Sequence, residues 1–439
     1  MPTNFIFILA DDLADDLGCT GARDAQGRPT DTSPKLDRLA AQGLRLTDDH
    51  SNPSVCSPTR FALITGRWQY RLRGGAEEPL PGPTGGDKVH GLPPQHPTLP
   101  SLLRDAGYAT ASVGKWHLGP LSEHGPLKCG YGEFFGYHSG GIDYFSHRNS
   151  RGQPDLGRGE APGQPEGYLT HLLSDAAVDF VHRQSAAQGF LLSLHYSAPH
   201  WPWLTRDDAA LSPQLTPGLK HTDGGSLATY QRMVHPMDEG IGRVLDALAT
   251  RGLADDTLVV FTSDNGGECY SNNWPFVGEK IDLLEGGIRV PLLARWPRRI
   301  APGNVSATPN ITLDWTATML AGAGVGAAPE HPLDSISLLP LLDNPAWNPR
   351  RDLAWRMTHR QQRALRRGDW KYLAMDGHKY LFNLAADARE RANLAQREPE
   401  RMADLRTAWQ PWNQTLPGNP GDAAVHLAFG PADLPQATH

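Results

Sequence analysis

The chain has 439 residues, of which 39% are hydrophobic and 20% are charged, with 46 glycines and 38 prolines. These proportions are ordinary for a soluble globular protein with a large core and long loops, and they argue against a low-complexity disordered chain. The formal net charge of −7 argues against a general nucleic-acid binder, and no apolar run is long enough to span a bilayer.

The cysteine content and the N-terminus bear on the compartment. Four cysteines (Cys19, Cys56, Cys129 and Cys269) are too few for a disulfide framework in a chain of this size. The N-terminus leads directly into a strand-like run, without the basic segment and separate apolar segment of a signal peptide. We therefore expect a cytoplasmic protein, or a periplasmic one if a signal sequence has been removed.

The first expected strand covers residues 4–10, a continuous apolar run typical of a strand buried on both faces. Asp11 and Asp12 follow at once. Adjacent carboxylates repel each other unless a cation or another partner neutralises them. This pair therefore indicates a metal site, with an exposed acidic turn as the alternative, because Asp15 and Asp16 come next.

A helix is expected to begin near Cys56. Pro58 suits the first helical position, and Gly66 is a plausible end of the helix. Cys56 would then lie at the positive end of the helix dipole, where an anion is favoured, and Arg60 would lie one turn further on the same face. A nucleophile precursor and a fixed cation beside an anion site suggest chemistry on an anionic ester. The alternative is a buried cysteine before an ordinary helix.

Three more buried strands are expected, over residues 108–113, 190–196 and 257–262, and each is followed by residues capable of chemistry. These residues are Lys115 and His117 after the first strand, His200 after the second, and Asp264 and Asn265 after the third. Lysine binds anions, histidine moves protons near neutral pH, and carboxylate and amide oxygens suit Ca²⁺ or Mg²⁺. Taken singly, each group has a structural alternative. Lys115 and His117 could be surface residues, and His200 could be a structural histidine packed between tryptophans. Asp264 and Asn265 could belong to an Asp-Asn-Gly turn.

The position of these residues strengthens the functional interpretation. Strands that alternate with helices imply a mostly parallel sheet, in which ligands bind beyond the carboxyl ends of the strands. Four polar clusters at four such ends are much less probable by chance than one. The sequence therefore predicts one site at this edge of the sheet.

Longer motifs identify a family. The string Cys-x-Pro-Thr-Arg at 56–60, followed by Thr-Gly-Arg at 65–67, resembles the signature of the type I sulfatases. Gly-Lys-Trp-His at 114–117 and Glu-Gly-Gly-x-Arg-Val-Pro at 285–291 are similar to further sulfatase motifs, as are the paired aspartates and the Pro-His sequence at 199–200. The resemblance covers most of the chain. It implies an alkaline-phosphatase-like α/β sandwich, with a large, mostly parallel sheet flanked by helices.

In that family the cysteine is oxidised to formylglycine. The resemblance therefore implies hydrolysis of an aryl or carbohydrate sulfate monoester, through a gem-diol at residue 56 and a covalent sulfo-enzyme intermediate. It also implies a maturation enzyme as a partner and one divalent cation, with Ca²⁺ preferred and Mg²⁺ as the alternative. The implied metal ligands are Asp11, Asp12, Cys56, Asp264 and Asn265.

The resemblance also assigns catalytic roles. Arg60 positions residue 56, and Lys115 and Lys280 bind sulfate oxygens. His200, together with Lys280, protonates the leaving alcohol, and His117 removes a proton from the remaining hydroxyl of residue 56.

A change in composition over 341–351 predicts a boundary between a catalytic domain, 1–345, and a C-terminal α+β subdomain, 346–439. In the subdomain, short strands are expected over 353–357, 363–366, 370–375 and 380–384, followed by a helix over 399–409. This arrangement resembles the small antiparallel sheet and helix that end sulfatase chains.

Two other functions stay open. A phosphonate or phosphate monoesterase on the same scaffold would use a similar site, because a tetrahedral anion beside a metal does not reveal sulfur or phosphorus. A non-catalytic, metal-dependent binding protein would result if Cys56 remained a thiol. Trp201, Trp203 and Trp274 are candidates for stacking on an aryl group or a sugar, or for core packing. Charged residues of the loop 71–97 are candidate substrate contacts or solvated loop charges.

Overall fold

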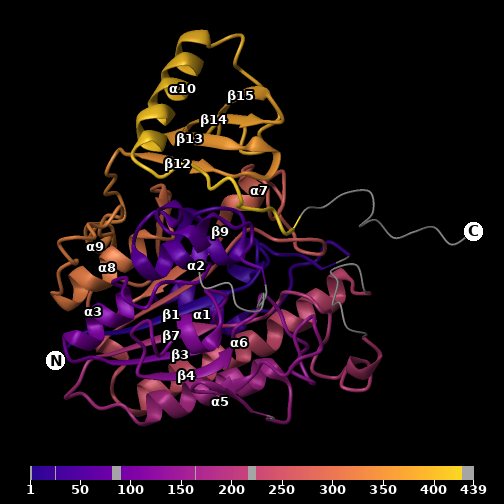
Figure 1. Cartoon of the computed structure of the whole chain (residues 1–439), viewed down its shortest axis with the longest axis vertical. Helices are drawn as coiled ribbons and strands as arrows, with labels where there is room; N and C mark the ends of the chain where they lie inside the picture. The colour runs from indigo at the N-terminus through magenta and orange to yellow at the C-terminus, as the bar shows by residue number, and fades with distance from the viewer. Residues whose placement is uncertain (1, 25, 82–89, 164, 216–223, 428–439) are drawn as a thin grey trace, which may run out of the picture.

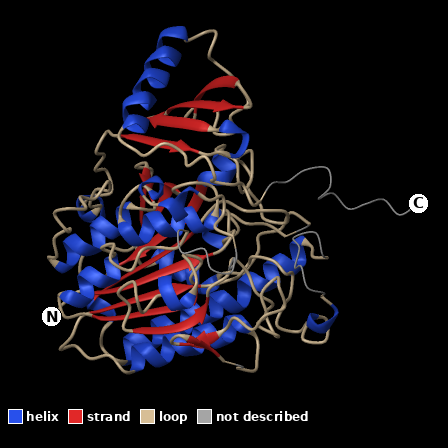
Figure 2. Ribbon diagram, in the orientation of Figure 1, coloured by secondary structure: helices blue, strands red, loops and turns tan. Residues whose placement is uncertain are grey.

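The computed structural model describes residues 2–24, 26–81, 90–163, 165–215 and 224–427. Within these residues, eleven strands form one large sheet and four strands form a smaller one (Figures 1 and 2). The large sheet contains β1 (Asn4–Ala10), β2 (Leu44–His50), β3 (Ala109–Lys115), β4 (Glu133–Tyr137), β5 (Gly157–Arg158), β6 (Ala161–Pro162), β7 (Phe190–His195), β8 (Thr257–Ser263), β9 (Arg289–Arg295), β10 (Asn304–Ser306) and β11 (Asn310–Ile311).

The four strands predicted as core are neighbours at the centre of the large sheet, in the order β8-β1-β7-β3, and all three pairings are parallel. In register, Ile8 of β1 lies opposite Leu194 on one side and Phe261 on the other. Every residue of β1, β7 and β8 is buried, which explains their continuous apolar sequences. The predicted mostly parallel sheet is confirmed, although β9 runs antiparallel to both β2 and β8.

Helices cover both faces of the large sheet (Figure 1). Alternate side chains of β1 enter the two cores. Ile6 and Ile8 pack in the core that includes α1 (Pro34–Ala41), α5 (Leu169–His182) and α6 (Leu227–Thr250). Phe5, Phe7 and Leu9 pack in the other core, with α2 (Cys56–Thr65), α3 (Leu99–Asp105), α8 (Asp314–Ala323) and α9 (Leu339–Asp343). Two single-turn helices, α4 (Leu121–His124) and α7 (Glu285–Ile288), lie in connecting segments.

The smaller sheet is antiparallel and has α10 (Pro399–Gln414) on one face, as expected (Figure 1). Its strands are β12 (Asp352–Arg356), β13 (Arg363–Arg367), β14 (Trp370–Met375) and β15 (His378–Asn383). Leu365 and Leu381 pack against Leu405 of α10. On the opposite face, Trp355 shares a core with Ala62 of α2. The smaller sheet and the helix that carries Cys56 therefore contribute to one hydrophobic core.

The proposed boundary at residue 345 stays a prediction. None of the described helices combines the length and apolar character needed to cross a bilayer.

Candidate active site

The carboxyl ends of the four central strands bring the predicted side chains together. Asp11 and Asp12 follow β1, and His200 follows β7 after a short connection. Lys115 is the last residue of β3, because that strand extends two residues beyond its predicted end. The ten predicted residues are all at most 4% exposed: Asp11, Asp12, Cys56, Arg60, Lys115, His117, His200, Asp264, Asn265 and Lys280. The structure brings all ten together, and their individual roles stay predictions.

A group of acidic side chains forms a candidate metal centre. Ligand atoms of Asp11, Asp12, Cys56 and Asp264 all lie within 4.8 Å of one another. Asn265 donates from Nδ2 to Asp12 Oδ1 at 2.7 Å, and its buried Oδ1 has no hydrogen-bond partner among the described residues. Burial and the charge of Asp11 raise the pKa of Asp264 to about 6. Crowded carboxylates beside an unpartnered amide oxygen fit a hard divalent cation such as Ca²⁺ or Mg²⁺.

Three cationic side chains surround the carboxylates. Lys115 Nζ lies 2.5 Å from Asp11 Oδ2. Lys280 Nζ lies 2.7 Å from Asp12 Oδ2 and 2.9 Å from Glu268 Oε2. The sequence analysis did not single out Glu268, although an acidic residue soon after Asp264-Asn265 was a visible signal. Through these contacts both lysines are held at the buried acidic group.

Arg60 forms the third of these contacts, with Asp264. Its Nε and Nη2 donate to Asp264 Oδ2 at 3.0 and 2.8 Å. A further donor, Nη1, bonds the carbonyl oxygen of Lys115 at 3.0 Å. One guanidinium therefore ties the helix α2 to the ends of β3 and β8.

Cys56 is the first residue of α2. The predicted helix is confirmed, but it begins two residues earlier than expected, so Pro58 occupies its third position. Gly66 ends the helix with φ of +63°, as predicted. No side chain caps the N-terminus and no acidic residue lies in the first turn, which leaves the positive end of the helix available to an anion.

The Cys56 side chain points into the acidic group, with Sγ 3.4 Å from Asp11 Oδ1. Burial raises the pKa of its thiol well above the ordinary range, in spite of the nearby Lys115 and Lys280. An unmodified thiol here stays protonated and is a weak nucleophile.

Two neutral histidines face the same site. His117 Nε2 lies 2.9 Å from the carbonyl oxygen of Leu80, which only accepts, so Nε2 carries the hydrogen. Its Nδ1 is buried without a hydrogen-bond partner among the described residues. His200 Nδ1 donates to the carbonyl of Trp201 at 2.5 Å, and Nε2 lies 3.6 Å from Asp12 Oδ2. Burial lowers the pKa of His117 well below its usual range and that of His200 to about 3. Each ring therefore keeps one nitrogen able to accept a proton.

Backbone strain accompanies this geometry. Asp12 and His117 have φ of +63° and +55°, in the left-handed region that non-glycine residues rarely adopt. Such strain persists where the surrounding fold over-determines a side-chain position, and it is common at functional sites.

The site opens into a pocket of about 220 Å³. Cys56, His117, His200 and Lys280 line it together with a mixed polar and apolar wall: Pro79, Leu80, Pro81, Ser139, Gly140, Gly141, Ser150, Trp201, His426 and Leu427. Of the three candidate tryptophans, Trp201 lies in this wall. Trp203 belongs to the core, and Trp274 is 61% exposed, with Arg389 over its ring.

Within the described part of the loop at 71–97, four charged residues make other contacts. Arg71 pairs with Asp334 at 2.7 Å, and Arg73 pairs with Glu77. Glu78 accepts hydrogen bonds from two backbone amides of the segment before β13. None of these four loop residues is among the residues that line the pocket.

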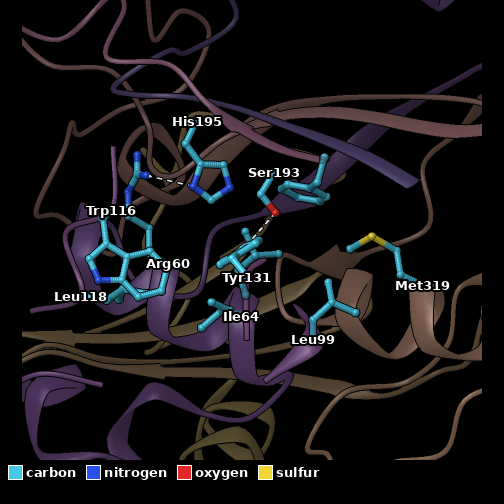
Figure 3. A pocket seen from close by; sticks show the side chains of 11 residues that line it. Arg60, Ile64, Leu99, Trp116, Leu118, Tyr131, Ser193, His195 and Met319 are labelled. Atoms are coloured by element: carbon cyan, nitrogen blue, oxygen red, sulfur yellow. Dashed lines mark hydrogen bonds between the residues drawn. The ribbon is translucent and has the colours of Figure 1, made fainter. Parts of the chain in front are cut away.

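A small internal cavity of about 20 Å³ lies against the buried side of Arg60 (Figure 3). His195 and Ser193 from β7 line it, and His195 Nδ1 is 3.4 Å from Arg60 Nη1. Burial, reinforced by the charge of Arg60, lowers the pKa of His195 to about 3, so its neutral ring accepts a hydrogen bond from the guanidinium. His195 lies within a strand, and nothing in that sequence position shows in advance that it contacts Arg60.

A second buried group of charged side chains lies between the two sheets. Its members, here called the inter-sheet cluster, are Asp48, His50, Glu285, Arg289, Arg366, Lys371 and Glu390. Asp48, His50 and Glu285 are close enough together to hold a metal ion. However, Arg366 binds both carboxylate oxygens of Asp48, at 2.5 and 2.6 Å.

The other carboxylates of the inter-sheet cluster are paired in the same way. Lys371 Nζ lies 2.8 Å from Glu285 Oε1 and 2.9 Å from Glu390 Oε1, and Arg289 donates to Glu285 Oε2. Protein cations already neutralise this group. It joins the motif at 285–291 to the smaller sheet.

Comparisons with known proteins agree with this geometry. A family model described as Sulfatase matches residues 3–325. The chain is similar to N-acetylgalactosamine-6-sulfatase of Homo sapiens, with 34% identity over 392 residues that cover 83% of this chain and 71% of that protein. Arylsulfatase A of Homo sapiens is 31% identical over 390 residues, which cover 80% of this chain and 70% of that protein.

A solved structure is also similar to the whole chain. The crystal structure of Ps i-CgsB in complex with k-i-k-neocarrahexaose matches with a TM-score of 0.83 and 29% sequence identity. The match covers 95% of this chain and 94% of that one.

Proposed function

The chain belongs to the sulfatase family and is a sulfatase, and from this premise we propose that it hydrolyses saccharide sulfate monoesters through a formylglycine made from Cys56. One observation carries the proposal. Cys56 Sγ lies within 4.8 Å of ligand atoms of Asp11, Asp12 and Asp264, at a site that lines the pocket. Residue 56 is thus placed where a tetrahedral anion would meet both the acidic group and its surrounding cations.

Oxidation of residue 56 supplies the nucleophile that the buried thiol lacks. The hydrated aldehyde carries two hydroxyl groups. One attacks sulfur and releases the alcohol, and the second loses its proton so that sulfate is expelled and the aldehyde is restored. A thiol has no second hydroxyl, so it could not complete this last step.

The cationic side chains stabilise the charge of the reacting ester. Lys115 and Lys280 lie at the acidic group with their ammonium groups buried, where their attraction for sulfate oxygens is stronger than in water. Arg60 acts through its position, since its bonds to Asp264 and to the end of β3 hold the first turn of α2 in place.

The two histidines move protons. His117 presents an unpartnered Nδ1 and is neutral, which suits removal of a proton from the remaining hydroxyl of residue 56. His200 has its Nε2 beside Asp12 and lines the same pocket as Lys280, which supports a role in protonating the leaving alcohol.

A divalent cation completes the proposed site. Asp11, Asp12, Asp264 and the free Oδ1 of Asn265 would hold it, together with residue 56. When bound, a Ca²⁺ or Mg²⁺ ion lowers the pKa of a hydroxyl that it contacts and offsets the charge of the carboxylates.

The choice of saccharides over aryl esters depends on the pocket wall and on the similar structures. Serine, histidine and glycine residues line the wall beside Trp201, which offers an aromatic face to a sugar. The similar Ps i-CgsB was solved with a neocarrahexaose, and the similar human enzyme is named for N-acetylgalactosamine 6-sulfate.

Two measurements test the proposal. Mass spectrometry of the peptide that contains residue 56 should show the loss of mass that accompanies conversion of the thiol to the aldehyde. The modified protein should then hydrolyse sulfate esters in a screen of paired sulfate, phosphate and phosphonate esters. A thiol at residue 56 with no turnover would favour a binding protein. Preferred turnover of phosphate or phosphonate would assign the site to phosphoryl chemistry.

Removal of the metal is a further check. Chelation should abolish turnover, and added Ca²⁺ should restore it better than Mg²⁺. Full activity in the presence of excess chelator, after dialysis, would contradict the proposed cation.

A further inference from the structure

The wall of the pocket contains two residues from the far end of the described chain. His426 and Leu427 line the same pocket as Cys56 and His200. They belong to the segment 422–427, here called the C-terminal strap, which follows α10 and returns to the large domain. The strap therefore places side chains at a pocket whose other lining residues belong to the large sheet and its loops.

Backbone hydrogen bonds hold the strap in a defined position. Val425 forms a parallel β-bridge with Glu78. The Glu78 amide donates to the Ala424 carbonyl at 3.1 Å, and the His426 amide donates to the Glu78 carbonyl at 2.8 Å. Glu78 immediately precedes Pro79, Leu80 and Pro81 of the pocket wall, so the strap and this part of the wall form one unit.

Glu77 fixes the ring of His426. Its buried carboxylate accepts from the Ala424 amide at 3.2 Å and from His426 Nε2 at 2.9 Å through the same oxygen, Oε2. The other oxygen of Glu77 pairs with Arg73, which also lies 3.1 Å from Asp422 Oδ2. Nε2 is thus the donor to a carboxylate that is 1% exposed, and the orientation of the imidazole is set before any ligand arrives.

This orientation leaves Nδ1 of His426 for a ligand. No hydrogen bond to Nδ1 occurs among the described residues, and the side chain is 35% exposed at the pocket. A flat apolar leaving group would cover this nitrogen without bonding it, whereas a hydroxyl would satisfy it. The arrangement of a buried acceptor, a fixed ring and a free nitrogen is that of a specificity contact.

We propose that His426 Nδ1 hydrogen-bonds a hydroxyl of the sugar that carries the sulfate, and that the C-terminal strap thereby favours saccharide sulfates over aryl sulfates. This inference rests on the proposed function and deepens it. Trp201 lines the same pocket, where its indole ring could contact the same sugar. His426 would act on substrate binding and not on the bond that breaks.

The experiment compares two classes of substrate and two isosteres of histidine. The probes are 4-nitrophenyl sulfate, N-acetylgalactosamine 6-sulfate and sulfated neocarrahexaose. In His426→Gln the amide can still reach Glu77 from the position of Nε2 but offers nothing at the position of Nδ1. In His426→Asn a polar atom remains near the position of Nδ1. His378→Ala serves as the matched control, since His378 is exposed on the smaller sheet.

We expect His426→Gln to lose about tenfold in kcat/KM on the better saccharide sulfate, which corresponds to one lost hydrogen bond, and less than twofold on the aryl ester. The Asn variant should retain more saccharide activity than the Gln variant, and the control should match wild type on all probes. Equal melting temperatures will show that the variants are folded.

Several outcomes would overturn the inference. Parallel losses on both classes of substrate, or no loss on either, would remove His426 from substrate recognition. A Gln variant that matches wild type beside an impaired Asn variant would show that only the bond to Glu77 matters. Wild-type turnover of the aryl ester without turnover of either saccharide would refute the saccharide contact and the saccharide specificity of the proposed function, but would leave the sulfatase chemistry in place. Turnover of no sulfate ester would refute the proposed function as a whole.

Discussion

The candidate active site and the inter-sheet cluster are built from the same kinds of buried side chain, but they differ in the polar atoms that face a pocket. In both groups the carboxylates contact a lysine or arginine side chain. In the candidate active site, however, the Oδ1 of Asn265 and the Nδ1 of His117 have no partner within the described ranges, and Cys56 and His117 line the pocket. Unused bonding capacity beside a pocket therefore distinguishes a reactive site from a structural one, whereas charge and burial alone do not.

The largest expected effect is on activity and comes from Cys56→Ala. This change removes the precursor of the proposed nucleophile and leaves the surrounding charges in place, so kcat/KM for a sulfate ester should fall by at least about 10⁴-fold. Initial rates measured with the best substrate will check this. Cys129→Ala is the matched control, because Cys129 is also buried but does not line the pocket. If the Cys56 variant kept more than a few percent of the activity, residue 56 would not be the source of the nucleophile.

Substitutions in the inter-sheet cluster should lower the stability of the fold instead of the activity. Lys371→Met leaves Glu285 and Glu390 buried without their shared ammonium group, and breaking a buried pair in this way costs about 3–5 kcal/mol of unfolding free energy. Urea unfolding at neutral pH measures the loss. Lys379→Met, at an exposed position of β15, should stay within about 0.5 kcal/mol of wild type. A similar effect of both substitutions would show that the cluster does not hold the sheets together.

Substitution of His195 should have a smaller effect on activity than substitution of Cys56, because His195 contacts Arg60 but does not line the pocket. His195→Leu removes one of the two acceptors of Arg60 Nη1, and we expect kcat to fall about tenfold with little change in KM. His195→Asn places an acceptor near the position of Nδ1 and should recover part of the loss. If the Leu variant loses stability but keeps its kcat, His195 is only a core residue.

The smallest expected effect is a change in the pH dependence of stability. Burial, together with the charge of Glu285, raises the pKa of Glu390 from 4.5 to about 7. Between these values the folded state holds a proton that the unfolded state has released, so the contribution of Glu390 to stability falls as the pH rises from about 4.5 to about 7.

Glu390→Gln cannot titrate, and its stability should therefore lack this fall. Melting temperatures of wild type and variant, measured from pH 5 to pH 8, should differ by an amount that changes across this window. Parallel curves would contradict the shifted pKa. Activity per folded molecule should stay near that of wild type, since Glu390 does not line the pocket.

Much of the fold could be predicted from local sequence. The strands β1, β7 and β8 are continuous apolar runs because they are buried on both faces, and this pattern is readable without neighbours. By contrast, β2 carries Asp48, Asp49 and His50 at one end, and β9 contains a proline, so neither looks like a core strand. Their pairing with each other is a tertiary fact that no local pattern records.

The clustering of the candidate site residues was predictable for a related reason, although their roles stay predictions. Its residues follow strands that can be recognised, and topology brings the ends of parallel strands together. Glu268 was missed although it follows Asp264 and Asn265 closely, whereas His195 and His426 were missed because each contacts a residue far away in the sequence. The last of these depends on a bridge between Glu78 and Val425, segments that have no strand signal of their own.

The order of the strands in the large sheet has a consequence for the timing of biosynthesis. The strand β1 lies between β7 and β8, which the ribosome makes much later, so the sheet cannot close around the first part of the chain until residue 263 has emerged. In the closed fold Cys56 is 2% exposed, at the base of the pocket that it lines. If the proposed formylglycine is made by another enzyme, we expect that enzyme to act before the sheet closes, on a nascent or unfolded chain, and a chain that folds untreated to keep its thiol.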